Sequence, residues 1–390
     1  LLQKLSIDIK YSSRSIEWKD QGEIPLKPRT STKENLFYID DPKDLVAEAE
    51  KMSTILDTKY VAADLRQVAA DTPNLSTSQQ KKLEALLRKY EPLFDGTIGT
   101  WKMSKYNIKL KEDVVPYHGR AYQIPKAYER QVRAEVDRLV KIGVLKKINH
   151  SPWAAPCFVI PKKDRTIRFI SDFRELNKRI KRNPFPLPKI QDLLLKLEGF
   201  KYATSLDLNM GFYHIKLDAT SRKLCTIVLP WGKYEYNALP MGLCNSPDIF
   251  QEKMSELMQG LNFVRTYIDD LLCISAGSYE DHLDKLDEVL KRVQEAGLKV
   301  NARKSFFAQP ELEYLGYWIT REGIMPIQKK VHAIQNLAVP KNKKQLRSFI
   351  GMINYYRDMW IRRSEILAPL SKVTSKNAKW EWNTEQQQAF

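Results

Sequence analysis

Two adjacent aspartates, Asp269 and Asp270, interrupt an otherwise apolar and β-branched run, FVRTYIDDLLCIS. Burying a carboxylate costs several kcal/mol unless another group compensates its charge, so this segment cannot be a plain buried strand. Two interpretations are open: a tight hairpin turn that exposes both acids to solvent, or a hairpin that presents both carboxylates to a cation. Oxygen ligands suit Mg²⁺, which proteins bind through one or two carboxylates together with substrate phosphates. In both cases the segment predicts two strands joined at the aspartates.

The same tetrapeptide, YIDD, occurs earlier in the chain at residues 38–41, but in a different setting. There it is followed by Pro42 and by a run with helical spacing. An aspartate at the N-cap with proline at the first helical position is a common way to begin a helix. We therefore predict that Asp40 and Asp41 begin a helix and carry no chemistry.

A cation site needs further ligands, and Asp207 is the best candidate because it is a lone acid in the strand-like run KYATSLDLNMGFYHI. Taken alone, it could equally cap the end of a strand. Together with Asp269 and Asp270 it would place three carboxylates on neighbouring strands. Such a set can hold two metal ions about 3.5–4 Å apart and support an in-line phosphoryl transfer.

The whole-chain composition limits the class of protein. A chain of 390 residues exceeds one ordinary core, which predicts two or three subdomains. Hydrophobic residues make up 43%, and no apolar run reaches the roughly 18 residues that span a bilayer. The net charge of +17 favours a polyanionic partner, either nucleic acid or an acidic membrane surface. The cysteines are widely separated, which argues against disulfides or a zinc site and fits a reducing compartment; they are Cys157, Cys225, Cys244 and Cys273.

Local patterns predict different structure along the chain. Residues 1–30 predict short strands followed by a linker, and residues 42–90 have helical spacing, with Ser76 or Thr77 as the cap of the helix QQKKLEALLRKY. From about residue 104, strands joined by tight turns alternate with helices, which predicts an α+β fold with an antiparallel sheet.

The last helices are expected to form a separate helical module. One lies near residues 327–338, and the other is KKQLRSFIGMINYYRDMW. In the second helix, Phe349, Ile350 and Ile353 are expected to pack the core, while its basic residues and tyrosines suit contact with a nucleic-acid backbone.

From about residue 100 the chain resembles the reverse transcriptases of gypsy-type LTR retrotransposons, which are relatives of retroviral polymerases. The resemblance rests on seven blocks in a specific order and spacing, and the tail KWEWNTEQQQAF is similar to the family's junction into its RNase H domain. The blocks are GVLKKINHSPWAAPCFVIPKKD, RFISDFRELNK, SLDLNMGFYHIKL, YNALPMGLCNSPDIFQ, TYIDDLL, LEYLGYWI and SFIGMINYYR.

The opening stretch LLQKLSIDIKYSSRSIEW resembles the final strands of a retroviral-type aspartic protease, and an unrelated β-hairpin is the alternative. The protease triplet D-[ST]-G is absent, so we expect no proteolytic activity. Together the resemblances imply a piece of a longer Pol polyprotein. Its expected parts are a protease-like remnant at 1–27, a linker and N-terminal helical extension at 28–98, reverse transcriptase fingers and palm at 99–325, a thumb at 326–375, and at 376–390 the start of a connection to a missing RNase H domain.

The resemblance implies a right-hand polymerase of fingers, palm and thumb, with an antiparallel palm sheet backed by helices and a helical thumb. Asp207, Asp269 and Asp270 match the family's catalytic metal ligands. They would hold two Mg²⁺ ions, for which Mn²⁺ can substitute. The family's last aspartate, which Asp270 matches, can lie further from the metals than the other two.

The resemblance also implies positions that contact the incoming nucleotide. In the basic turn VIPKKDRTIRF, Lys162 and Arg168 match the triphosphate contacts, with Lys163 as a substitute for Lys162. A solvated hairpin turn is the alternative interpretation of this segment. Met241, where retroviral relatives often carry glutamine, is expected to form a wall of the nucleotide pocket by packing.

Two further positions would lie at the sugars. Phe212 matches the aromatic residue under the nucleotide sugar, which would exclude a 2′-hydroxyl and so favour deoxynucleotides. A core aromatic is the alternative, and Tyr213 is expected on the opposite face of a strand. Ile268 would press its β-branched side chain on the sugar at the primer end.

Template and primer contacts are expected from two segments. FRELNKRIKRN carries five positive side chains in nine residues, and Asn177, Lys178 and Arg179 are its expected template contacts; a solvated charged face is the alternative. Leu315, Gly316 and Tyr317 match the stretch that grips the primer strand. Gly316 would let backbone approach backbone there, and a plain strand bend is equally compatible.

The function implied is RNA-directed DNA polymerisation. An RNA-directed RNA polymerase is disfavoured by Ile268 and Phe212, and a catalytically silent nucleic-acid-binding relic is disfavoured by the intact aspartates. The expected partners are an RNA template, a DNA primer or RNA–DNA hybrid, and dNTPs, with no membrane. Dimerisation, or contact with the RNase H and integrase parts of the same polyprotein, is a further expectation. The expected location is cytoplasmic, in a virus-like particle, and nuclear later in the element's cycle.

Overall fold

The computed structural model describes the backbone of 7–10, 15–18 and 22–25, and then residues 62–161, 167–194, 197, 199–360, 362–375 and 377–390. The chain divides into two compact units, Leu1–Glu48 and Ala49–Phe390. No helix in the described ranges has both the length and the apolar character to cross a membrane.

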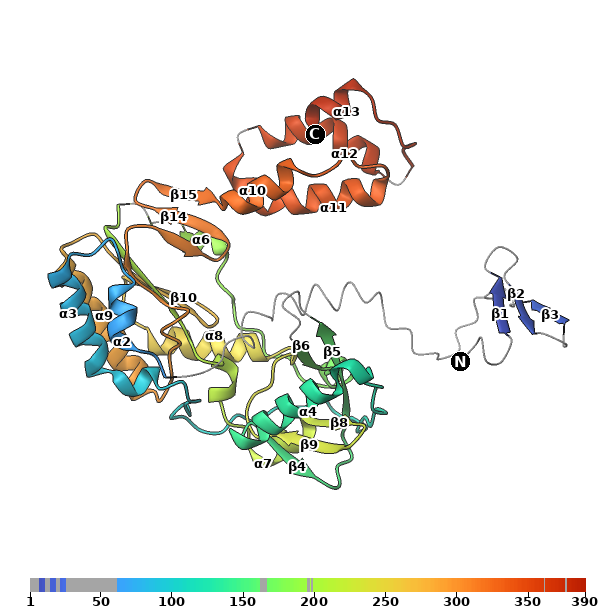
Figure 1. The fold of residues 1–390 in the computed structure, drawn as a ribbon, viewed down its shortest axis with the longest axis horizontal. Coiled ribbons are helices and arrows are strands. Elements are labelled where there is room, and N and C mark those ends of the chain that lie inside the picture. Colours follow the sequence, from blue (N-terminus) through green and yellow to red (C-terminus); the bar gives the residue numbers. More distant parts are fainter. Residues whose placement is uncertain are drawn as a thin grey trace. The chain divides into compact units, whose positions relative to one another are not determined.

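The first unit contains the predicted short strands. They pair as a three-stranded antiparallel sheet in the order β1-β2-β3 (Figure 1). Its likeness to a protease tail stays a prediction, and so does the helix start at residues 38–41, which lie outside the described residues. The strands are β1 (Ile7–Lys10), β2 (Ser15–Trp18) and β3 (Gly22–Pro25).

A four-stranded antiparallel sheet with strand order β10-β11-β7-β12 lies at the centre of the second unit. Its strand β11 alternates, so that Leu271 and Cys273 enter the main core beneath helix α9, whereas Leu272 enters a second core on the other face. The strand pair predicted around the two aspartates is confirmed. The elements are β10 (Val264–Tyr267), β11 (Asp270–Ser275), β7 (Tyr202–Asp207), β12 (Phe306–Gln309), α8 (Ser246–Leu257) and α9 (Tyr279–Glu295).

The strand predicted through KYATSLDLNMGFYHI is wrong beyond Asp207. The backbone of Met210 is left-handed, with φ 54°, and the 3₁₀ helix η4 (Gly211–His214) follows. Phe212 and Tyr213 are both buried in this turn, where they pack on different aromatic rings and not on opposite faces of a strand. Since apolar residues fill a buried tight turn as readily as a strand, the local pattern could not separate the two.

A second sheet has five strands in the order β4-β9-β8-β5-β6, with α4 packed against β4 and β6. The predicted hairpin around the basic turn is confirmed by the antiparallel pairing of β5 with β6, and residues 162–166 between them lie outside the described residues. The elements are α4 (Lys126–Lys141), β4 (Leu145–Ile148), β5 (Ala155–Pro161), β6 (Ile167–Ser171), α5 (Arg174–Asn177), α6 (Ile190–Leu194), α7 (Ala219–Leu224), β8 (Thr226–Leu229) and β9 (Gly232–Tyr236).

The C-terminal part combines a small antiparallel sheet, in the order β13-β14-β15, with short helices. Phe349 and Ile353 are buried in a separate core, and Ile350 packs against it, as predicted. The elements are β13 (Leu312–Tyr314), β14 (Tyr317–Thr320), β15 (Gly323–Pro326), α10 (Gln328–Gln335), α11 (Lys343–Ile353), η5 (Asn354–Met359), α12 (Arg363–Thr374) and α13 (Thr384–Ala389).

In the first helical segment of the second unit, α3 packs on α9 and α2 packs on α3. The capping prediction is confirmed, because Ser76 forms a reciprocal capping box with Gln79. The Tyr279 hydroxyl donates to the Gln79 carbonyl at 2.8 Å, and Leu83 and Leu87 are fully buried in the main core. These elements are α2 (Leu65–Ala70), α3 (Thr77–Lys89) and η3 (Glu91–Phe94).

Replacing Leu87 by alanine should destabilise the whole second unit, because its side chain is fully buried in the core that α3 shares with α9. We expect the free energy of unfolding in urea to fall by about 2–5 kcal/mol. The control is Lys82→Ala, which removes an exposed ion pair with Glu280 and should leave stability almost unchanged. An equal, small effect of both variants would contradict the packing of α3 as part of this core.

Candidate active site

Three aspartates meet at one end of the four-stranded sheet. Asp207 ends β7 and lies opposite Asp270, the first residue of β11, in the strand register. Asp269 occupies the two-residue turn that joins Tyr267 of β10 to Asp270. The structure thus brings together all three acids proposed from the sequence, although more than 60 residues of chain separate Asp207 from the other two.

These carboxylates repel one another in a partly buried site. Burial and the charge of Asp269 raise the pKa of Asp207 to about 6. Burial, followed by the charges of Asp269 and Asp207, raises the pKa of Asp270 to about 7, and burial also raises the pKa of Asp269. The ammonium group of Lys304 lowers the pKa of each of the three, and so partly offsets their unfavourable charge.

The donor set fits a hard divalent cation, because it consists of carboxylate oxygens whose charge is incompletely compensated. Within the described ranges, no three His, Cys, Asp or Glu side chains form a ready-made metal cluster. A magnesium-type ion keeps several waters and is held through one or two carboxylates plus substrate phosphates. Asp207, Asp269 and Asp270 can therefore serve such an ion without forming a complete cage.

The turn that carries Asp269 is strained, and a buried glutamine holds it. Ile268 has φ 54°, a conformation that is unfavourable for a β-branched residue and costs about 1–3 kcal/mol. The Ile268 N–H donates to Gln251 Oε1 at 2.6 Å, while Gln251 Nε2 lies 3.3 Å from the Thr266 carbonyl. Since Gln251 belongs to α8 and is 1% exposed, the helix fixes the shape of the aspartate turn from behind.

The loop that leads into β12, which pairs with β7, supports Asp207. The Asp207 N–H donates to Ser305 Oγ at 3.1 Å, and the Asn301 N–H donates to the Asp207 carbonyl at 2.8 Å. Ser305 Oγ also donates to the Asn301 carbonyl at 2.8 Å, which closes the loop on itself. Lys304 lies within this loop. The same backbone segment that bonds to Asp207 therefore also places the Lys304 ammonium group near the aspartates.

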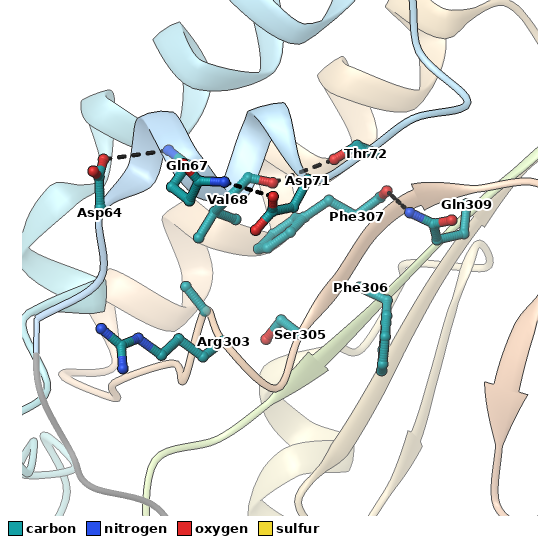
Figure 2. Close-up of a pocket in the computed structure, with 11 residues that line it drawn as sticks. Asp64, Gln67, Val68, Asp71, Thr72, Arg303, Ser305, Phe306, Phe307 and Gln309 are labelled. Carbon is teal, nitrogen blue, oxygen red and sulfur yellow. Dashed lines mark hydrogen bonds between the residues drawn. The ribbon is translucent and has the colours of Figure 1, made fainter.

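A cavity of about 390 Å³ borders the same loop without reaching the three aspartates. Figure 2 shows Gln67 of α2 and its C-cap residue Asp71 on one side, and Arg303, Ser305 and Phe306 on the other. Gln67 Nε2 donates to Asp71 Oδ1 at 2.6 Å. This cavity is therefore formed by α2 with its flanking residues, by the loop before β12 and by β12 itself, and none of the three aspartates lines it.

The residues predicted to bind the nucleotide are only partly brought together. Phe212 packs on Phe250, with ring centroids 5.2 Å apart, and a methyl group built on Gly211 would lie 3.3 Å from Asp269 Cβ. The turn of Phe212 thus abuts the aspartate turn. Met241 is partly buried against the main core.

The basic turn predicted to contact the triphosphate is placed only in part. Arg168 lies on β6, opposite Ile160 of β5 in the strand register. Lys162 and Lys163 lie outside the described residues, so their side chains are not placed.

The residues predicted to contact the template differ in what their side chains already bind. Asn177 holds the loop after Met241, since its Nδ2 donates to the Gly242 carbonyl at 2.8 Å and its Oδ1 accepts from the Cys244 N–H at 2.9 Å. Arg179 donates to the Val115 carbonyl and to Glu175, whereas Lys178 is mostly exposed and pairs with Glu175. Only Lys178 of this trio has most of its side chain open to solvent.

The predicted primer-contacting residues form the turn between β13 and β14. Leu315 and Gly316 both have positive φ, 48° and 80°, and Tyr317 is buried. Within the protein, the group that approaches Gly316 is the Tyr355 hydroxyl, which a Cβ on Gly316 would meet. The close approach of the primer backbone to Gly316 stays a prediction.

Two residues that hold the site escaped the sequence analysis. Gln251 had a usable signal, because it is a polar residue between Phe250 and Met254 on the buried face of a helix. Lys304 had none, because nothing local distinguishes it among 64 lysines and arginines.

Comparison with known proteins identifies the central part of the chain. Residues 160–319 match the family model for reverse transcriptase (RNA-dependent DNA polymerase). The chain is 32% identical over 338 residues to the retrovirus-related Pol polyprotein from transposon 412 of Drosophila melanogaster, covering 84% of this chain and 27% of that polyprotein. It is 30% identical over 291 residues to the Tf2-3 transposon polyprotein of Schizosaccharomyces pombe, covering 73% and 22%. The chain thus spans about a quarter of the length of these relatives.

Solved structures agree with the expected right-hand polymerase fold, which is confirmed. A foamy viral protease-reverse transcriptase in complex with double-stranded DNA superimposes with a TM-score of 0.77 at 27% identity, covering 84% of this chain and 59% of that chain. The foamy viral protease-reverse transcriptase in complex with an RNA/DNA hybrid gives a TM-score of 0.74 at 27% identity, covering 84% and 44%.

Replacing Gln251 by leucine should loosen the turn that carries Asp269. Leucine leaves the partly buried Ile268 N–H without its acceptor, which costs about 1 kcal/mol of stability. We expect faster hydrogen–deuterium exchange at the Ile268 amide. The control Ser255→Ala removes a different neighbour of Gln251 Nε2 and should leave exchange at Ile268 as in the wild type. Unchanged exchange in Gln251→Leu would show that this bond does not hold the turn.

The raised pKa values predict a pH-dependent stability for the metal-free protein. Because the pKa of Asp270 is about 7 in the folded state and near 3.9 when unfolded, the folded state binds more protons between these values, and stability falls as pH rises through them. Asp270→Asn removes this titration. In EDTA, the free energy of unfolding of Asp270→Asn should be close to that of the wild type at pH 4. It should exceed the wild-type value by a growing margin as the pH rises towards 8.

The exposed Asp284→Asn serves as the matched control for that experiment, since Asp284 lies on the outer face of α9. Its free energy of unfolding should stay close to that of the wild type, because this exposed side chain lies away from the three aspartates. A pH-independent effect of Asp270→Asn would contradict the raised pKa.

Proposed function

Because the chain carries the reverse transcriptase region of an LTR retrotransposon Pol polyprotein, we propose that it is an RNA-directed DNA polymerase, which extends a primer on an RNA or DNA template. One observation supports this most directly: Asp207, Asp269 and Asp270 converge at the end of one sheet, on neighbouring strands. Reverse transcriptases as a family depend on divalent metal ions, and these carboxylates are the chain's proposed metal ligands.

The three aspartates would hold two Mg²⁺ ions, with Mn²⁺ as a substitute. When bound, such ions supply charge that stabilises the attacking primer oxygen and the leaving pyrophosphate. The chain's own part is to keep the carboxylates close together despite their repulsion, which β7, β11 and the loop of Lys304 do. Gln251 adds the orientation of Asp269 through the turn at Ile268.

We propose the nucleotide contacts from the match of these residues to the family's motifs. Arg168, together with Lys162 or Lys163 of the basic turn, would bind the triphosphate. Met241 would line the pocket. Phe212 would lie beneath the nucleotide sugar and exclude a 2′-hydroxyl, which the contact of its turn with Asp269 supports.

We propose the template and primer contacts in the same way. Lys178 would bind template phosphates directly, whereas Asn177 and Arg179 would act through the backbone segments that they hold in place. Ile268 would press on the primer-end sugar, and Leu315, Gly316 and Tyr317 would grip the primer strand. The net charge of +17 supports partners that carry phosphates.

The wider setting is also proposed from the relatives. The partners would be an RNA template, a DNA primer or RNA–DNA hybrid and dNTPs, and the chain would act as a monomer or dimer beside RNase H and integrase parts. It would work in a cytoplasmic virus-like particle and later in the nucleus. The chain would consist of five parts: the protease remnant at 1–27, the linker and helical extension at 28–98, the fingers and palm at 99–325, the thumb at 326–375, and the start of the connection at 376–390.

The test is extension of a DNA primer on an RNA template with Mg²⁺, using dNTPs or rNTPs. We expect extension with dNTPs only, and Asp269→Asn should lower it by more than roughly a hundredfold, because losing even an indirect partner of a metal costs 10- to 100-fold. Salt-sensitive template–primer binding should be nearly unchanged in this variant, because other residues contact the phosphates.

Asp284→Asn is again the matched control and should extend like the wild type. Tight template–primer binding without any extension by the wild type would indicate a silent nucleic-acid-binding relic. Extension with rNTPs would indicate an RNA polymerase, and would count against the proposed role of Phe212.

A further inference from the structure

The turn that joins β13 to β14 is a strained hairpin whose conformation needs external support. Its two residues, Leu315 and Gly316, have φ 48° and 80°, and the flanking Tyr314 and Tyr317 pair across it. Positive φ at both central positions is the type I′ pattern, for which asparagine and glycine are preferred. Leucine at the first position is unfavourable in this conformation. Contacts from outside the hairpin are therefore needed to stabilise the turn.

Two consecutive tyrosines of η5 hold this turn by its carbonyl groups. The Tyr355 hydroxyl donates to the Leu315 carbonyl at 2.6 Å, and the Tyr356 hydroxyl donates to the Gly316 carbonyl at 3.3 Å. In return, the Tyr317 hydroxyl donates to the Tyr355 carbonyl at 2.9 Å. The turn and η5 are thus joined by three hydrogen bonds, each of which uses a tyrosine hydroxyl.

The aromatic rings of these tyrosines also contact one another. Tyr317 stacks on Tyr355 with ring centroids 5.2 Å apart, and Tyr356 meets the ring of Tyr355 edge-on at 5.0 Å. The ammonium of Lys330 lies 5.2 Å from the centre of the Tyr355 ring. The hydroxyls are therefore held in position by packed rings and not by mobile side chains.

The change from α11 to the 3₁₀ helix η5 allows both tyrosines to make this contact. Adjacent residues of an α-helix do not face the same neighbour, yet Tyr355 and Tyr356 both reach the turn. They do so because α11 ends at Ile353 and continues as the tighter η5, in which Tyr356 leaves helical geometry at φ −99° and ψ 22°. A helical segment tightened in this way commonly marks a hinge or a functional contact.

We propose that Tyr355 and Tyr356 are positioning residues for the primer terminus: they hold the Leu315–Gly316 turn in the conformation that grips the primer strand, and so couple that turn to the C-terminal helices. The inference rests on the proposed function, in which Leu315–Tyr317 contact the primer. The two tyrosines act through the turn and need not touch nucleic acid. A shift of η5 would move the primer end relative to the aspartates.

The test compares Tyr355→Phe and Tyr356→Phe with the matched control Tyr128→Phe, whose hydroxyl lies on α4, away from the turn. Each variant removes one hydroxyl and keeps the ring. A 2-aminopurine placed at the 3′ end of a bound primer reports where that end lies, and primer extension reports kcat and KM separately. Hydrogen–deuterium exchange of residues 315–317 reports the turn itself.

For Tyr355→Phe we expect faster exchange in the turn, an altered 2-aminopurine signal and a kcat/KM for primer–template about threefold to tenfold lower, the range of one lost hydrogen bond. The KM for dNTP and the unfolding midpoint should stay close to those of the control. Tyr356→Phe should act in the same direction but less, since its bond is longer. Gly316→Ala, which displaces the Tyr355 hydroxyl and strains a backbone with φ 80°, should lower kcat/KM in the same direction.

Two outcomes would overturn the proposal. One is wild-type exchange in the turn of Tyr355→Phe, and the other is faster exchange with an unchanged 2-aminopurine signal and unchanged kcat/KM, which would leave a purely structural contact. Absence of extension by the wild type would instead refute the proposed polymerase function, and the 2-aminopurine signal would still decide on the tyrosines.

Discussion

The electrostatic repulsion among Asp207, Asp269 and Asp270 is the constraint on which the rest of the structure depends. Three partly buried carboxylates with raised pKa values are unfavourable in the absence of a cation, so the surrounding fold must hold them together. The four-stranded antiparallel sheet does this through backbone pairing of β7 with both β11 and β12. The loop that contains Lys304 adds hydrogen bonds to Asp207 and one compensating positive charge.

Two hairpin turns in this molecule share one design. At Ile268 and at Leu315, a bulky residue adopts a left-handed backbone conformation that would be unfavourable in an isolated hairpin. In each case side chains from a helical segment, Gln251 or the pair Tyr355 and Tyr356, bind the backbone of the turn. Strained backbone persists only where its surroundings determine it, and both turns lie where the proposed function needs a fixed geometry.

Helices α2 and α3 belong to the core that lies beneath the four-stranded sheet of the three aspartates. Helix α3 packs on α9, which in turn packs on β11 and β7. In the loop between α2 and α3, Asn74 Nδ2 donates to the Ala308 carbonyl of β12. Helices α2 and α3 and the 3₁₀ helix η3, which come before the matched reverse transcriptase region, therefore belong to the core that supports the sheet. The cavity beside Ser305 lies at this junction of α2 with the supporting loop.

The amino-acid sequence by itself determined the features that depend on short stretches of chain. These include the strand pair around Asp269, the cap at Ser76, the core positions Phe349 and Ile353, and, through seven ordered blocks, the fold class. Local periodicity failed at Phe212, because a buried 3₁₀ turn and a strand are both apolar. It also gave no sign that Lys304 lies near the aspartates, or that the side chains of Asn177 and Arg179 bind backbone carbonyl groups of the protein. Only the tertiary structure decided these points, as well as the bonds from Gln251 and Tyr355 to the two turns. Each of them depends on a contact between residues that are separated in the chain, and no local pattern of residue types specifies which residues will meet.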